Sequence, residues 1–188
     1  VQSSLADEVW PAASTIKLFI LITAYLEFGE DWYQVPSDLA SLLDGNEEVS
    51  ECLGMFDSDT RRVISSHLSG MSYRDLALSM MGVNQNQIGN SAYNAAANIL
   101  IHELGGPEEC TWKISSFSED FHSVRVGRYM LMNRTAENDN VCSMRALAAA
   151  CRLLADRSIP GLSEQDYSDI IGCFQTSDFM GYTVYEKH

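Results

Sequence analysis

The run WPAASTIKLFI (residues 10–20) sets a lysine, Lys17, inside an otherwise apolar segment, three residues after Ser14. A charged amine on an apolar face is costly unless it has a partner or loses its proton. From residue 14 to residue 28 apolar residues occupy almost all sides of a helical pattern, and Gly29 follows as a stop. The sequence therefore predicts a helix that is buried on most sides and carries Lys17 near its start.

The spacing of Ser14 and Lys17 has a chemical consequence. Residues three apart lie on one face of a helix, so the hydroxyl and the amine come within reach of each other. Burial lowers the pKa of a lysine, and a neutral amine can take the serine proton as the oxygen attacks a carbonyl. Backbone N–H groups at a helix start suit a developing oxyanion. The pattern indicates acyl transfer; the alternative is that Ser14 caps the helix and Lys17 extends to water.

Most of the remaining chain has helical periodicity and helix-capping residues, among them Ser72 with Asp75 and Ser143. We expect further helices over residues 38–43, 49–56, 75–83, 92–104, 144–157 and 163–174. The polar, glycine-bearing run at 84–91 indicates a loop, and residues 111–123 are expected to be irregular. A convincing strand pattern occurs at YTVYE, residues 182–186.

Length and charge narrow the class of protein. A chain of 188 residues with 46% hydrophobic content predicts one globular domain over residues 1–188. A net charge of -14 with 12 Lys and Arg argues against a nucleic-acid partner. No apolar stretch reaches the roughly 18 residues that a membrane span needs. The oligomeric state stays open.

No metal site or cofactor is expected from linear motifs. The five cysteines form no C-x-x-C pair and no zinc-type spacing, and buried free thiols are the expectation for them. His102 and Glu103 begin like the zinc-peptidase motif H-E-x-x-H, but Gly106 occupies the second histidine position. His67, His102 and His122 are expected to be surface or hydrogen-bonded histidines.

Three patches in order carry a family resemblance. They are PAASTIKLFI, then YRDLALSMMGV followed by NAAANILIHELGGPEE, then VRVGRYMLMNRTAENDNVCSMRALAAACRLL. From about Trp10 to Lys187 the chain resembles the class A β-lactamases and the penicillin-binding D-alanyl peptidases. The resemblance implies an α+β fold of the β-lactamase/transpeptidase kind. This chain would cover mainly the helical part of that fold, with few strands, and would lack parts of the flanking sheet.

The resemblance also implies roles for particular residues. Ser14 would be the acylated nucleophile and Lys17 its general base or proton relay. Asn98 matches a structural asparagine of the family. A class A β-lactamase uses a glutamate in the loop before the N-x-[TS]-[TS] helix cap to activate water. Glu137 is the one acid of that type here, and its position close to the cap predicts a surface residue and therefore a persistent acyl-enzyme.

The S-x-N motif of the family is where this chain departs most. Counting forward from Met80 places residues 84–86 (Asn-Gln-Asn) there, and counting back from Asn98 places residues 92–94 (Ala-Tyr-Asn) there. Neither alignment supplies the serine. A substrate amide contact and a hydroxyl that passes a proton to the leaving nitrogen would still be needed. The candidates are Asn94 and Asn86 for the amide contact, and Tyr93 and Ser91 for the hydroxyl.

The third family motif, K-[TS]-G, is matched by its lysine. Lys187 precedes His188, and the glycine of the motif is absent from this sequence. The resemblance implies that Lys187 binds a substrate carboxylate as a point charge. The implied protein is an extracytoplasmic serine hydrolase or acyltransferase that acts on β-lactams or D-alanyl peptides of the cell wall. The alternative is a catalytically inactive relative that keeps the scaffold for binding or structural purposes.

Overall fold

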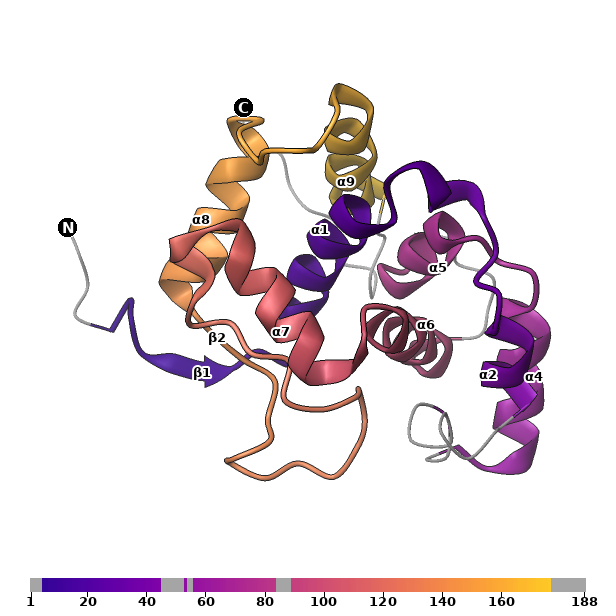
Figure 1. Ribbon diagram of the computed structural model, residues 1–188. Coiled ribbons are helices and arrows are strands. Elements are labelled where there is room, and N and C mark those ends of the chain that lie inside the picture. The colour runs from indigo at the N-terminus through magenta and orange to yellow at the C-terminus, as the bar shows by residue number, and fades with distance from the viewer. Residues whose placement is uncertain (1–4, 45–52, 54–55, 84–88, 177–188) are drawn as a thin grey trace.

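Helix α1 (Ile16–Phe28) is the central element of the fold. The computed structural model describes residues 5–44, 53, 56–83 and 89–176, and in Figure 1 α1 lies in the middle of them. All ten residues from Ile16 to Tyr25 are buried, which confirms the predicted all-round burial of this helix. Gly29 ends the helix with a positive φ of 40°, a conformation that glycine adopts without a Cβ penalty.

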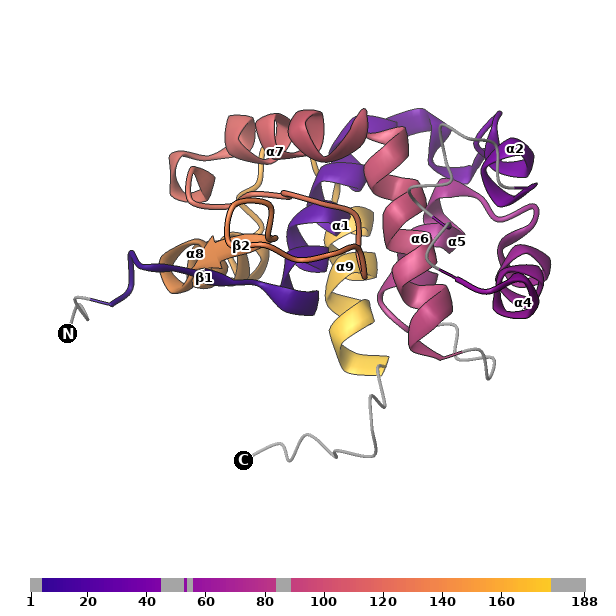
Figure 2. The ribbon, with the colours of Figure 1, turned by 90° about the horizontal axis from the view of Figure 1, so that it is seen from below.

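The other helices pack around α1 on several sides. They are α2 (Leu39–Asp44), α4 (Ser58–Leu68), α5 (Tyr73–Met80), α6 (Asn90–Glu103), α7 (Gly106–Phe117), α8 (Met144–Ala155) and α9 (Glu164–Thr176), with three short 3₁₀ helices, η1 (Ala13–Thr15), η2 (Gly29–Tyr33) and η3 (Glu119–Phe121). Helices α5, α6, α7 and α9 contact α1 directly. Figures 1 and 2 place α8 and the strands on one side of α1, and α2 and α4 on the other.

Two short antiparallel strands lead the chain into the start of α1. Strand β1 (Val9–Pro11) pairs with β2 (Val141–Ser143). The paired residues are Val9 with Ser143, Trp10 with Cys142 and Pro11 with Val141. Directly after β1, the Ala12 N–H donates to the Asn140 carbonyl at 2.7 Å. This pairing fixes the backbone immediately before Ser14.

Two predicted helix starts are confirmed by their cap geometry. The Ser72 hydroxyl accepts from the Asp75 N–H at 3.2 Å, and the Asp75 side chain bonds back to Ser72, which forms a capping box at the start of α5. The Ser143 hydroxyl accepts from the Ala146 N–H at 3.1 Å at the start of α8. The expected helices at 38–43, 92–104 and 163–174 also form, as α2, α6 and α9.

Two expectations of secondary structure need correction. The predicted irregular segment 111–123 was wrong in its first half, because α7 runs to Phe117 and η3 follows. Pro107 lies in the first turn of α7, where its missing N–H costs no hydrogen bond, so the Gly-Gly-Pro run that ends α6 also begins α7. Helix α4 and strands β1 and β2 form where no sequence pattern predicted them.

Some sequence expectations lie largely or wholly outside the described residues. These are the strand at 182–186, most of the helix at 49–56 and residues 84–88 of the expected loop. Asn90 and Ser91, expected in that loop, instead begin α6. The four cysteines of the described segments are free thiols, and Cys151 is the exposed one among them, contrary to the expectation of burial. Within the part of the chain that the structure describes, no helix combines the length and the apolar character that a membrane span requires.

Candidate active site

Ser14 and Lys17 line one cavity at the start of α1. The cavity has a volume of about 170 Å³, and its wall is formed by Ser14, Lys17, Met80, Met81, Asn90 and Tyr93. Ser14 belongs to η1 and its side chain is exposed. Lys17 belongs to the first turn of α1 and is only 6% exposed. An accessible hydroxyl therefore shares a small cavity with a buried amine.

The alternative interpretation, in which Ser14 caps the helix and Lys17 extends to water, does not match the geometry. The N-cap residue of α1 is Thr15, not Ser14, and the Thr15 hydroxyl donates to the Ala12 carbonyl instead of capping the helix. Lys17 is buried rather than extended into water. Just before the serine, Ala13 has a positive φ of 46°, which is rare for a residue with a Cβ and is strained. The Ser14 hydroxyl makes no hydrogen bond to any of the described residues.

Burial changes the protonation of Lys17. Loss of water around the amine lowers the pKa of Lys17 from 10.5 to about 8. Among the described residues no carboxylate forms a salt bridge with it, and no described acceptor receives a hydrogen bond from it. A substantial fraction of the amine is therefore neutral near pH 8 and able to accept a proton.

The far wall of the cavity comes from the end of α5 and the start of α6. Met80 and Met81 supply apolar surface, and Asn90 and Tyr93 supply polar atoms. Gly82 permits this arrangement, because its φ of 76° is a conformation that glycine adopts without a Cβ penalty. Sequence reasoning did not identify Asn90 as a site residue. Asn90 belongs to the polar run at residues 84–91, whose composition predicts a loop and not the start of a helix.

The remaining predicted site residues are not part of the described cavity wall. Asn94 is buried, 2% exposed, and is not part of the cavity wall; its Oδ1 has no hydrogen-bond partner among the described residues. Ser91 is half-buried and is not part of the wall either. Asn86 and Lys187 lie outside the described residues.

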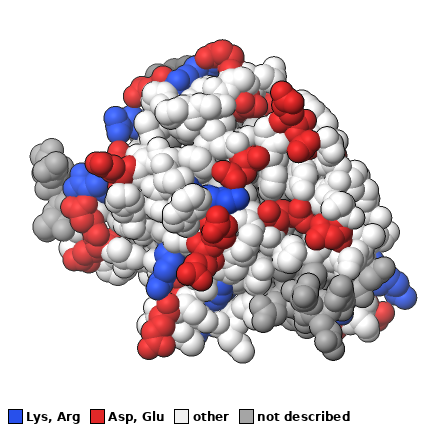
Figure 3. Space-filling model, viewed as in Figure 1, with Lys and Arg blue, Asp and Glu red and all other residues white. Residues whose placement is uncertain are grey.

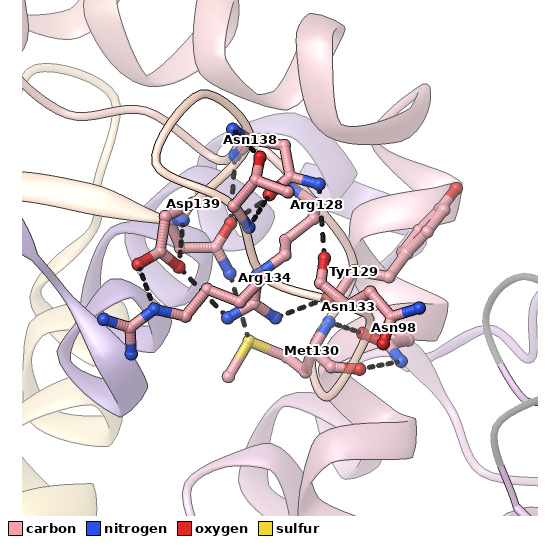
Figure 4. A network of polar contacts seen from close by, with 11 residues as sticks. Asn98, Arg128, Tyr129, Met130, Asn133, Arg134, Asn138 and Asp139 are labelled. Atoms are coloured by element: carbon pink, nitrogen blue, oxygen red, sulfur yellow. Dashed lines mark hydrogen bonds and ion pairs between the residues drawn. The ribbon is translucent and has the colours of Figure 1, made fainter.

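A loop from Arg125 to Asn140 is held against α6 by polar contacts (Figure 4). The Arg128 guanidinium donates to Asp139 Oδ1 at 3.0 Å, and Arg134 Nε lies 2.9 Å from the other oxygen of Asp139. The Asn140 side chain accepts from two backbone N–H groups at the start of the loop. These contacts join the two ends of the loop.

Asn98 of α6 binds the same loop through the backbone of Met130. Its Nδ2 donates to the Met130 carbonyl at 3.2 Å, and its Oδ1 accepts from the Met130 N–H at 2.5 Å. Asn98 is completely buried, and Figure 4 shows it facing Met130. The expected structural role of this asparagine is confirmed.

Replacing Asn98 with alanine is expected to lower the free energy of unfolding by about 2 kcal/mol, because a buried N–H and a buried carbonyl of Met130 lose their partner. Urea unfolding followed by circular dichroism measures the change. Asn133→Ala is the matched control, because Asn133 is exposed on the same loop. Equal loss in both variants would contradict the anchoring role of Asn98.

The cavity contains no acidic residue among the described side chains. Glu137 is exposed on the loop, as expected. Asp139 is buried, but both of its oxygens are paired with arginines. The described residues therefore place an exposed hydroxyl and a buried amine on one cavity wall, with no described carboxylate on that wall.

A family model described as "Beta-lactamase enzyme family" matches residues 2–179. No curated protein sequence matches the chain.

The fold is shared with solved structures, among them two β-lactamases. A β-lactamase from Burkholderia vietnamiensis is 18% identical with a TM-score of 0.59, and the match covers 94% of this chain and 61% of that one. A β-lactamase from Streptomyces albus G is 20% identical with a TM-score of 0.54, and the match covers 92% of this chain and 59% of that one. The chain thus spans about three fifths of the length of either structure. It corresponds to a mainly helical part of their fold.

Proposed function

The chain belongs to the beta-lactamase enzyme family, and on that basis we propose that it forms an acyl-enzyme through Ser14, with a β-lactam or a D-alanyl peptide as acyl donor. The observation that carries this proposal is the shared cavity of Ser14 and Lys17. Burial of a lysine without a described counterion lowers the stability of the folded protein. Its placement beside an exposed hydroxyl is accounted for by proton transfer.

The reaction proceeds in balanced steps. Neutral Lys17 takes the proton of the Ser14 hydroxyl while Oγ forms a bond to the substrate carbonyl carbon. Backbone N–H groups at the start of the helical segment stabilise the oxyanion that results. The carbon–nitrogen bond of the substrate amide then breaks, and the nitrogen takes up the proton held by Lys17. The Tyr93 hydroxyl, on the opposite wall of the cavity, relays that proton.

In this proposal, side chains on α6 and near the carboxyl end of the sequence bind the substrate. The family resemblance assigns the substrate amide contact to Asn94; because Asn94 is buried outside the cavity wall, this role requires the wall to open toward its unpaired Oδ1. Asn90 lies on the cavity wall and assists. Lys187 binds the substrate carboxylate. These substrates occur outside the cytoplasm, so the protein acts there.

The acyl-enzyme is expected to persist. Hydrolysis of the ester needs a base that activates water, and no described carboxylate lines the cavity. Behaviour like that of a penicillin-binding protein is therefore favoured over rapid antibiotic hydrolysis.

A non-catalytic relative is the second candidate, and one observation favours it. Ala92, which counting back from Asn98 places at the serine of the S-x-N motif, is completely buried and has no hydroxyl. A scaffold that has lost this group could serve binding alone.

Intact mass after incubation with benzylpenicillin separates the two candidates. We expect the mass to rise by one penicillin per chain, and the adduct to be absent in Ser14→Ala because the ester oxygen is gone. Ser158→Ala, at an exposed serine away from the cavity, is expected to keep the adduct. Failure of every β-lactam tested to form an adduct would favour the binding scaffold. An adduct that survives in Ser14→Ala would exclude Ser14 as the nucleophile.

A further inference from the structure

A second group of ionisable side chains gathers at the opposite end of α6. His102 and Glu103 lie in its last turn, and Asp38 lies directly before α2. Each of the three offers one ligand atom, and these atoms all lie within 4.8 Å of one another. From Tyr93 to His102 the helix rises about 14 Å, at 1.5 Å per residue. The group is therefore separate from the cavity of Ser14.

Glu103 is the most constrained member of this group. Its Oε2 accepts a hydrogen bond from the Tyr73 hydroxyl at 2.7 Å. Its Oε1 is buried and has no hydrogen-bond partner among the described residues. A buried oxygen without a partner costs free energy. A proton or a cation bound at Oε1 would remove this cost.

The electrostatic surroundings are negative. The Asp38 and Glu103 carboxylates lie within 4.8 Å of each other, so they repel one another when both are ionised. None of the described Lys or Arg side chains forms a salt bridge with this group; the partner of Asp38 is His102, at 3.9 Å. Acidic side chains also prevail over basic ones on the face seen in Figure 3.

We propose that Asp38, His102 and Glu103 bind a divalent transition-metal cation, with Zn²⁺ as the best fit. One imidazole nitrogen and two carboxylate oxygens match the ligands of zinc sites that keep an open position, whereas Mg²⁺ and Ca²⁺ prefer oxygen ligands alone. The Asp38 side chain is 52% exposed, so water can complete the coordination.

The geometry needs only a small adjustment. Ligand atoms at about 2.1 Å from a tetrahedral zinc lie about 3.4 Å from one another, and the exposed Asp38 carboxylate is free to turn toward the other two. The Tyr73 hydroxyl orients Glu103 from outside the ligand set, as outer partners do in zinc sites. The linear H-E-x-x-H motif does not reveal this group, because Asp38 comes from another segment of the chain.

Calorimetric titration of the full chain with ZnCl₂ tests the proposal. We expect one Zn²⁺ per chain, with binding lost in His102→Gln and in Asp38→Asn. Tyr73→Phe keeps the ligands and removes their support, so about a 10- to 100-fold weaker affinity is expected. Glu103→Gln is nearly isosteric and is expected to abolish binding while the circular dichroism spectrum stays unchanged.

Matched controls exclude other zinc ligands. His122 and Cys151 are both exposed, so His122→Gln and Cys151→Ser test whether a surface imidazole or thiol binds the metal instead. Both variants are expected to bind Zn²⁺ as the parent chain does. Titration with Co²⁺ is expected to give visible absorption without a thiolate charge-transfer band. Absence of binding, binding that survives His102→Gln and Asp38→Asn, or binding lost in Cys151→Ser would each overturn the proposal. Ser14 acylation is measured separately and does not bear on this outcome.

Discussion

Lys17→Ala is expected to slow acylation of Ser14 by about 10²- to 10⁴-fold, the range that a positioned general base contributes. The buried amine is the one described basic group on the cavity wall, so no neighbouring side chain there takes over the proton. The rate of labelling by a fluorescent penicillin, followed on denaturing gels, measures the loss.

The composition of the chain provides a matched control for this experiment. The sequence has three lysines, and Lys113 lies in α7, where its Nζ is 2.7 Å from Glu27 of α1 and away from the cavity. Lys113→Ala removes the same charge and is expected to acylate at the parental rate. If Lys17→Ala labels as fast as Lys113→Ala, the amine of Lys17 is not the base.

Lys17→Met is expected to raise the free energy of unfolding at pH 7 by up to about 3 kcal/mol, even though it removes the proposed base. The folded-state pKa of Lys17 is about 8, and its ordinary value is 10.5. The unfolded chain therefore binds more protons between these values, and stability rises with pH through this window. Below pH 8 the folded protein bears the whole cost of the shift, at about 1.4 kcal/mol per pKa unit. Methionine fills the same space without that cost.

Urea unfolding at pH 7 and pH 10 tests this expectation. The gain from Lys17→Met should shrink to below about 1 kcal/mol at pH 10, because the amine is then neutral in most folded molecules and in part of the unfolded ones. Lys113→Met loses the contact with Glu27 and is expected to give no gain at either pH. A destabilised Lys17→Met at pH 7 would show that the ammonium form is held favourably in the folded protein. The loss of stability that comes from burying the Lys17 amine is typical of functional sites, where activity is retained at the expense of stability.

The sequence predicted the central helix and several helix ends because local chemistry decides them. Apolar residues on all sides of α1 leave burial as the only stable arrangement, and Ser72 with Asp75 satisfies backbone groups within one turn. In contrast, α7 was missed because a Gly-Gly-Pro run is compatible with both the end of one helix and the start of another. The strands β1 and β2 have three residues each, too few for a period-2 pattern, and they form through pairing of distant segments.

The candidate active site was predictable where its residues are close in the sequence. Ser14 in η1 and Lys17 in the first turn of α1 come together through helical spacing, and the structure places both on one cavity. Asn90 reaches that cavity only because α6 begins earlier than its alanine-rich run indicates. Asp38 approaches His102 through the packing of separate segments, which no local pattern encodes. Contacts between distant residues thus account for most of what sequence reasoning missed.

The pKa of Lys17 is the most direct test of the account. With three lysines in the chain, ¹³Cε-labelled lysine gives three NMR resonances, and the one absent from Lys17→Met belongs to Lys17. Its chemical shift is expected to titrate with a midpoint near pH 8 in the folded protein. A midpoint near 10.5, the ordinary value for lysine, would show that the amine keeps its proton at neutral pH and would contradict its role as the base for Ser14.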